Sequence, residues 1–175
     1  MYLHEIQPAS RIFIDANIFV YHFSQGSEFN ASCTDFLAHV ETSRIHGVTS
    51  VAVIQEAAHR LMMVEASALL NGKETAVRNL PKYLKQHPDI VKQLTKHLIV
   101  PRKIAELNIN IVQITPKLIE ESQAVKTRFG FLSNDALTVA LMEEHQIAFL
   151  ASNDLDFERV EWLKLCLPAA SNASE

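Results

Sequence analysis

Four acidic side chains stand in largely apolar stretches of this 175-residue chain: Asp15, Glu56, Asp135 and Asp154. Carboxylates are seldom buried unless they are paired, hydrogen-bonded or bound to a metal ion. Four of them in such settings therefore predict one shared acidic pocket that holds a divalent cation. Mg²⁺ and Mn²⁺ are hard cations that prefer oxygen ligands, and Mg²⁺ commonly uses one or two carboxylates together with water and substrate phosphate.

An acidic pocket of this kind has a defined chemistry. Carboxylates packed together repel, which raises the pKa of at least one of them, and a cation relieves that repulsion. One or two ions can activate water and stabilise the charge that builds on a phosphodiester during in-line attack. Asp135 would also gain from the first turn of its predicted helix, where the helix dipole favours negative charge.

Each acid also has a purely structural explanation. Asp15 could turn the chain after a strand, Asp135 could stabilise the start of a helix, and Asp154 could cap a short turn. Glu56 could form an ion pair with Arg60 one helical turn later. Taken together, four acids in apolar settings favour the cation pocket.

Alternating strands and helices are expected to position these acids. Strands are predicted at 12–15, near Val48, and at 110–114, 147–151 and 162–166. Helices are predicted at 17–23, from Asn30 or Ser32 to before Gly47, from Thr49 or Ser50 to about Asn71, at 115–128 and at 133–145. Strands separated by helices imply an α/β protein with a parallel sheet covered on both faces. Ligands of such sheets bind beyond the carboxyl ends of the strands, where Asp15 and Asp154 fall.

Residues 1–175 are predicted to form a single domain, which is long enough to bury a substantial core. The core is expected at about 10–70 and 109–166, with a helical insertion at about 71–107 that is divided by three prolines. Residues 169–175 are expected to be a frayed, disordered tail.

Composition narrows the class of protein. A content of 48% hydrophobic and 21% charged residues is typical of a soluble globular protein. No apolar stretch approaches the length of a membrane-spanning helix and no secretory signal is visible, so we expect a cytoplasmic protein without membrane contact. Cys33 and Cys166 are expected to be reduced and packed. The absence of a glycine-rich phosphate loop argues against a nucleotide cofactor.

The formal charge of −4 conceals an asymmetry. Residues 71–103 carry eight of the 16 Lys and Arg side chains against two acids, so that this segment is +6 and the remainder is −10. Such a basic segment would suit a polyanionic substrate, because Lys and Arg neutralise phosphates. The alternative is that these side chains are the solvated faces of surface helices. The candidate substrate contacts in this segment are Lys73, Arg78, Lys82 and Lys85.

Four short motifs surround the acids in a fixed order. They are Phe13-Ile14-Asp15-Ala16-Asn17, then Val48-Thr49-Ser50 leading to Glu56, then Ser133-Asn134-Asp135-Ala136-Leu137, and last Ala151-Ser152-Asn153-Asp154-Leu155-Asp156-Phe157. Together they resemble the PIN-domain ribonucleases, most closely the toxins of the VapBC type. The last motif is similar to that family's threonine-x-Asp-x-Asp-Phe pattern, with serine in the first position. Each motif alone is weak, but all four in this order are quite specific.

The resemblance implies a three-layer PIN-like fold, in which helices flank a central parallel sheet of four or five strands. It implies Mg²⁺- or Mn²⁺-dependent endonuclease activity on RNA and, frequently, a homodimer. In the toxin branch it also implies an antitoxin partner whose peptide blocks the site. The residues that it assigns are Asp15, Glu56, Asp135 and Asp154 as metal-holding acids, Asp156 as a secondary acid, and Asn17 and Ser152 as polar neighbours of the site.

Three hypotheses follow. The leading one is a metal-dependent endoribonuclease, in which Lys or Arg side chains of residues 71–103 help to hold the RNA. The second is a metal-dependent phosphohydrolase that acts on a small phosphate ester; it is weakened because Asn17 stands where such enzymes often have a second Asp. The third is a non-catalytic RNA-binding or partner-binding module on the same fold, which would not need all four acids.

Overall fold

Five parallel strands form the centre of the molecule. The computed structural model describes residues 1–70 and 79–171. The strands lie in the order β3-β2-β1-β4-β5, and every neighbouring pair is parallel. Their bounds are β1 (Arg11–Ile14), β2 (His46–Ser50), β3 (Asn110–Val112), β4 (Phe149–Ala151) and β5 (Lys164–Cys166). The predicted α/β architecture, with helices around a parallel sheet, is confirmed.

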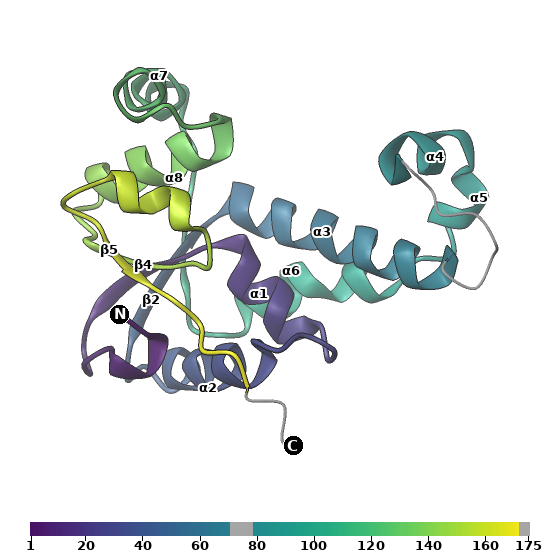
Figure 1. Cartoon of the computed structure of the whole chain (residues 1–175), viewed down its shortest axis with the longest axis horizontal. Helices are drawn as coiled ribbons and strands as arrows, with labels where there is room; N and C mark the ends of the chain where they lie inside the picture. The colour runs from purple at the N-terminus through teal and green to yellow at the C-terminus, as the bar shows by residue number, and fades with distance from the viewer. Residues whose placement is uncertain (71–78, 172–175) are drawn as a thin grey trace.

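Helices cover both faces of this sheet (Figure 1). One group connects β1 to β2 and β2 to β3: α1 (Ala16–Phe23), α2 (Asn30–Glu41), α3 (Val51–Leu70) and α6 (Val100–Ala105). The other group returns the chain from β3 to β4: α7 (Pro116–Phe129) and α8 (Ser133–Glu144). Because crossovers between parallel strands are right-handed, reversing the direction of travel along the sheet moves the second group to the opposite face. Short 3-10 helices are η1 (Leu3–Glu5), η2 (Lys96–Ile99) and η3 (Leu155–Arg159).

The central strand is buried on both faces. Ile12, Phe13 and Ile14 of β1 have no exposed surface, as expected for a parallel strand between two helical layers. Cys33 and Cys166 are free and buried, as predicted. Burial raises the pKa of the Cys33 thiol to about 12 and that of Cys166 to about 11. The two cysteines therefore act as small apolar core residues.

Local signals place several helix ends where the sequence predicts them. Ser50 accepts a hydrogen bond from the Val53 amide at 3.2 Å and so caps the start of α3. Thr115, which directly precedes the proline at the start of α7, accepts a hydrogen bond from the Leu118 amide at 3.2 Å. Gly130 ends α7 with a φ of 72°, the left-handed conformation that glycine adopts without strain.

Two local predictions are wrong because distant partners decide them. Asn30 does not cap α2; its side-chain amide donates instead to the carbonyls of Tyr21 and His22 at the end of α1. Residues 169–171, predicted as part of a frayed tail, are bound to the body. The Ala169 amide donates to Ser32 Oγ at 3.0 Å, so that Ser32 is not a cap either. Residues 172–175 lie outside the described part of the chain.

The described part of the helical insertion projects from the body. Helix α3 runs past the sheet, and α4 (Leu80–Gln86) and α5 (Pro88–Val91) lie near its far end (Figure 1). We call residues 79–95 the arm. A separate apolar cluster of Ala66, Leu84 and Leu94 joins the arm to α3. Prolines lie in the first turns of α4, α5 and α6, so that they divide this helical region, as predicted. None of the described helices is long and apolar enough to cross a membrane.

Candidate active site

The four acids come from four places around one edge of the sheet. Asp15 directly follows β1, and Asp154 lies three residues after β4, the strand paired with β1. Glu56 lies in the second turn of α3, which begins where β2 ends, and Asp135 lies in the first turn of α8. The chain moves outward from β1 to β3 and then returns to β4 on the other side of β1. This change of direction is the position at which doubly wound sheets open a crevice beyond their carboxyl ends.

Hydrogen bonds fix the carboxylate of Asp15. Its Oδ1 accepts a hydrogen bond from the Ala16 amide at 2.7 Å. Its Oδ2 accepts two more, from Asn17 Nδ2 at 2.6 Å and from Ser152 Oγ at 2.7 Å. Asn17 also donates to Ser152 Oγ at 2.9 Å and accepts from the Asn153 amide at 3.1 Å. The two predicted polar neighbours, Asn17 and Ser152, thus tie the end of β1 to the end of β4.

Burial and hydrogen bonding act on Asp15 in opposite directions. Burial raises the pKa of Asp15 to about 6, because the ionised form loses its hydration. The hydrogen bonds from Ser152 and the Ala16 amide lower the pKa, and the negative charge of Glu56 raises it further. Asp15 is therefore a carboxylate whose charge the surrounding protein only partly compensates.

Asp135 is influenced by the remaining acids. Its pKa is raised, first by burial and then by the charges of Asp154, Glu56 and Asp156. Arg60 opposes this effect and also lowers the pKa of Asp15. Because such Coulombic effects fall with distance, the acids are close enough to interact although they come from separate elements.

Glu56 is held by partners from two helices. Arg60 Nη2 lies 2.6 Å from Glu56 Oε1, so the ion pair named above as the structural alternative is present. Asn134 Nδ2 donates to Glu56 Oε2 at 2.8 Å and links the start of α8 to α3. Both carboxylate oxygens of Glu56 are therefore occupied. Arg60 is at the same time a positive charge that acts on three of the four acids.

The acids after β4 face different partners. Asp154 Oδ1 accepts a hydrogen bond from the Asp156 amide at 2.9 Å and caps η3, as its structural alternative predicted. Asp156 is exposed and lies 2.5 Å from Arg159 Nη2. The Asp154 amide donates to Ser152 Oγ at 3.1 Å, so that Asp154 is connected to Asp15 through one hydroxyl group.

The side chains as they stand do not form a coordination shell. Within residues 1–70 and 79–171, no group of three or more His, Cys, Asp or Glu side chains is arranged to hold a metal ion. Glu56 is directed to Arg60 and Asp156 to Arg159. The donor set still fits a hard divalent cation, since it consists of carboxylate oxygens around an Asp15 whose charge is only partly compensated. Glu56 would have to exchange Arg60 for such an ion.

Two amides in this region have roles that were not predicted. Asn134 holds Glu56, and Asn153 donates both to Asn17 through its backbone and to the hydroxyl of Tyr21 at 3.1 Å. The signal was available, because the tripeptide Ser-Asn-Asp occurs twice, at 133–135 and at 152–154.

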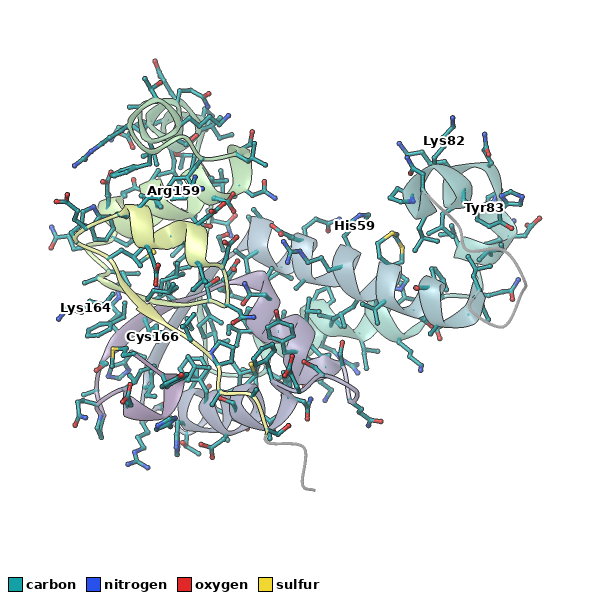
Figure 2. The ribbon with its side chains drawn as sticks, viewed as in Figure 1. His59, Lys82, Tyr83, Arg159, Lys164 and Cys166 are labelled. Carbon is teal, nitrogen blue, oxygen red and sulfur yellow. The ribbon has the colours of Figure 1, made fainter. Side chains whose placement is uncertain are left out.

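The predicted basic contacts lie away from the acids. Lys82 and Lys85 are exposed on α4, and Figure 2 shows Lys82 on the outer side of the arm. Lys73 and Arg78 fall outside the described residues. The arm therefore does not belong to the acid site itself. A substrate that contacts the arm must be long enough to reach from the arm to the acids.

Residues 12–163 match the sequence model of the PIN domain. The chain belongs to the PIN domain family. This PIN domain is 27% identical over 160 residues to "Ribonuclease VapC2" of Methanocaldococcus jannaschii, and the match covers 89% of this chain and 93% of that protein.

Solved structures share the fold of this PIN domain. The toxin VapC20 of Mycobacterium tuberculosis, described as cleaving the sarcin-ricin loop, aligns with a TM-score of 0.56 and 16% identity over 84% of this chain and 92% of its own. VapBC2 of Rickettsia felis, solved on a promoter DNA fragment, aligns with a TM-score of 0.52 and 15% identity over 90% and 98%. A toxin–antitoxin complex of Klebsiella pneumoniae aligns with a TM-score of 0.51 and 16% identity over 91% and 98%. At these identities the structures establish the fold alone.

Proposed function

We propose that this PIN domain is a metal-dependent endoribonuclease that hydrolyses RNA phosphodiester bonds. The observation that carries the proposal is the gathering of Asp15, Glu56, Asp135 and Asp154 at the carboxyl edge of the sheet, where the charge of Glu56 raises the pKa of Asp15 and the charges of Asp154 and Glu56 raise that of Asp135. The likeness to a ribonuclease over 89% of the chain supports it. A non-catalytic binding module would gain nothing from a buried carboxylate whose charge is poorly compensated.

The residues of the site have separable roles in this proposal. Asp15, Glu56, Asp135 and Asp154 would hold Mg²⁺ or Mn²⁺, with Asp156 as an outer acid. When bound, the ion supplies Lewis acidity that activates water and offsets the charge on the phosphate. Ser152 and Asn17 fix the direction of the Asp15 carboxylate, and Asn134 fixes that of Glu56.

Arg60 has two states in this scheme. In the structure its guanidinium neutralises Glu56 at 2.6 Å. If Glu56 held an ion instead, the guanidinium would be free to donate hydrogen bonds to a phosphate oxygen, for which its planar fork is well suited.

The relatives also suggest a protein partner. Two of the similar structures are a VapBC pair and a toxin–antitoxin complex. We therefore propose that this protein is the toxin of such a pair, that an antitoxin blocks its acid site, and that it acts on RNA in the cytoplasm. A homodimer stays a prediction from the family resemblance.

The phosphohydrolase hypothesis gains no support from the site. Its second acid would stand at Asn17, whose amide donates to Asp15 Oδ2 and to Ser152 Oγ. An amide in that role can neither accept nor release a proton as a general acid-base group.

Replacing Asp15 with Asn tests the proposed function. We expect a loss of at least about 100-fold in Mn²⁺-dependent cleavage of a single-stranded RNA, since one carboxylate ligand is removed while the side-chain shape is kept. Asp35→Asn, at an exposed carboxylate of α2, is the matched control and should leave cleavage unchanged. Cleavage by Asp15→Asn at the wild-type rate, from a preparation free of other nucleases, would refute the proposal.

A further inference from the structure

The arm rises from the face of α3 that carries Glu56. Residues spaced by three, four and seven positions share one face of a helix, and Glu56, His59, Arg60 and Met63 follow this spacing. Met63 packs against the cluster of Ala66, Leu84 and Leu94 that holds the arm. The step from Glu56 to Met63 is seven residues, or about 10 Å along the helix. One continuous helix face therefore leads from the acid site to the arm.

Two exposed side chains on this face lie beside Glu56, and one of them is a cation. His59 and Arg60 are both exposed. In Figure 2 His59 projects from α3 on the side on which α4 and α8 lie. Arg60 is the next residue and reaches back to Glu56. The positive charge of Arg60 therefore lies beside the acid site, on the helix that carries the arm.

The arm carries two exposed lysines and a stacked aromatic pair. Lys82 and Lys85 are exposed, and neither forms an ion pair with any residue that the structure describes. The rings of Tyr83 and His87 stack at a centroid distance of 4.0 Å and an angle of 20°. Lysines beside stacked rings are the combination with which proteins bind single-stranded nucleic acid, through phosphates and base faces respectively.

An acidic catalytic site needs such a surface. The four carboxylates attract a cation but repel the phosphates of a polyanionic substrate, so that much of the substrate affinity must come from elsewhere on the molecule. The ten residues from Glu56 to Ala66, where the arm packs, span about 15 Å along α3, a distance that a few nucleotides of single-stranded RNA can cover. A short RNA segment can therefore reach the acids and the arm at once.

We propose that the arm is an RNA-binding surface that holds the substrate strand a few nucleotides away from the bond that is cleaved. Lys82 and Lys85 contact the backbone phosphates, His59 and Arg60 line the path between the arm and the acids, and the Tyr83–His87 pair offers a face to a base. This inference rests on the proposed function for its substrate class and adds the place where that substrate is held.

Direct binding measurements test the arm apart from catalysis. In an Asp15→Asn background, which prevents cleavage, the affinity for a fluorescent 20-nucleotide single-stranded RNA is measured by anisotropy at several salt concentrations. We expect Lys82→Glu and Lys85→Glu each to weaken binding about five- to tenfold and to lower the slope of log affinity against log salt by roughly 1. Lys164→Glu, at the opposite end of the molecule in Figure 2, is the control and should change affinity less than twofold.

The outcomes separate this inference from the proposed function. With Asp15 restored and Mn²⁺ present, the arm variants should raise KM and leave kcat within about twofold. Wild-type affinity in both arm variants overturns the inference while the nuclease assignment stands. Cleavage that survives Asp15→Asn refutes the proposed function, yet the binding assay still decides the role of the arm.

Two further measurements distinguish a loss of RNA contacts from misfolding and from a loss of protein contacts. The neutral variants Lys82→Gln and Lys85→Gln should show smaller losses of affinity in the same order, with unchanged helix content by circular dichroism. Light scattering measures the oligomeric state of each variant. A change in oligomeric state with RNA affinity intact would assign the arm to a protein contact and overturn the inference.

Discussion

At the scale of single residues, the site depends on how Asp15 is charged. Its pKa of about 6 in the folded protein exceeds the ordinary value of 3.8 because of burial. For an acid with a raised pKa, the stabilising contribution is fully present below the unfolded value and is lost as the pH rises through the folded value. Without metal, this group therefore makes the folded state less stable at pH 7 than at pH 5. A bound divalent cation reverses that trend, since it binds the ionised form.

These opposite trends predict a pH-dependent metal effect. We expect Mn²⁺ at about 1 mM to raise the melting temperature of the wild-type protein at pH 7.5. At pH 5, where Asp15 is protonated, most of this increase should be lost. The melting temperature with Mn²⁺ and with chelator, at both pH values, checks this. Asp15→Asn should show little Mn²⁺ effect at either pH. A Mn²⁺ effect in the wild-type protein that is equally large at pH 5 would contradict the role given to Asp15.

Arg60 gives a second prediction at this scale. The guanidinium of Arg60 pairs with Glu56, and its positive charge lowers the pKa of Asp15 and of Asp135. Replacing Arg60 with Gln removes this charge. We expect about three- to tenfold tighter Mn²⁺ binding by titration calorimetry, because the ion no longer displaces a guanidinium, together with slower RNA cleavage. Arg102→Gln removes a comparable pair with Glu106 on α6 and is the matched control. Unchanged or weaker Mn²⁺ binding in Arg60→Gln would count against a shared charge pocket.

The sequence was more informative about acids than about amides. The four acids could be selected because a carboxylate within an apolar stretch needs a partner. Asn134 and Asn153 could not be selected on that ground, since an amide before a helix or turn is ordinary capping chemistry. Their roles follow only from the partners that the fold brings to them, Glu56 and Tyr21.

At the scale of elements, β2 allows a helix to approach the sheet closely. A Cβ atom at Gly47 would lie 2.7 Å from Val40 Cγ1 of α2 and 2.9 Å from Ile14 Cδ1 of β1. We expect Gly47→Ala to destabilise the fold by about 1–3 kcal/mol in urea unfolding, because these side chains must shift. At Gly26 an added Cβ meets nothing within 4 Å, so Gly26→Ala should cost less than about 0.5 kcal/mol. Equal stability of the two variants would show that the contact at Gly47 is not tight.

Elements were predictable where their signals are local. The cap at Ser50 and the Thr115-Pro116 start of α7 depend on hydrogen bonds between residues only three positions apart. The roles of Asn30 and of residues 169–171 are not, because their partners belong to other elements. Ala169, for example, donates to a hydroxyl group 137 positions away in the sequence.

At the scale of the whole molecule, negative charge at the sheet edge and positive charge on the arm occupy different parts of the structure. The alternation of strands and helices was enough to predict a parallel sheet with its ligand site beyond the strand ends. The strand order was not predicted, because local patterns do not specify which strands pair. The arrangement of the carboxylates was not predicted either, since it depends on competing partners such as Arg60 and Arg159.

The position of a bound ion tests the central claim most directly. Crystals of the protein soaked in Mn²⁺ would locate the ion by its anomalous scattering. We expect an ion about 2.1 Å from an oxygen of Asp15 and from one or more of Glu56, Asp135 and Asp154, with Arg60 turned away from Glu56. An ion bound elsewhere, or ordered crystals in which millimolar Mn²⁺ leaves Arg60 on Glu56 and no ion beside Asp15, would contradict the account.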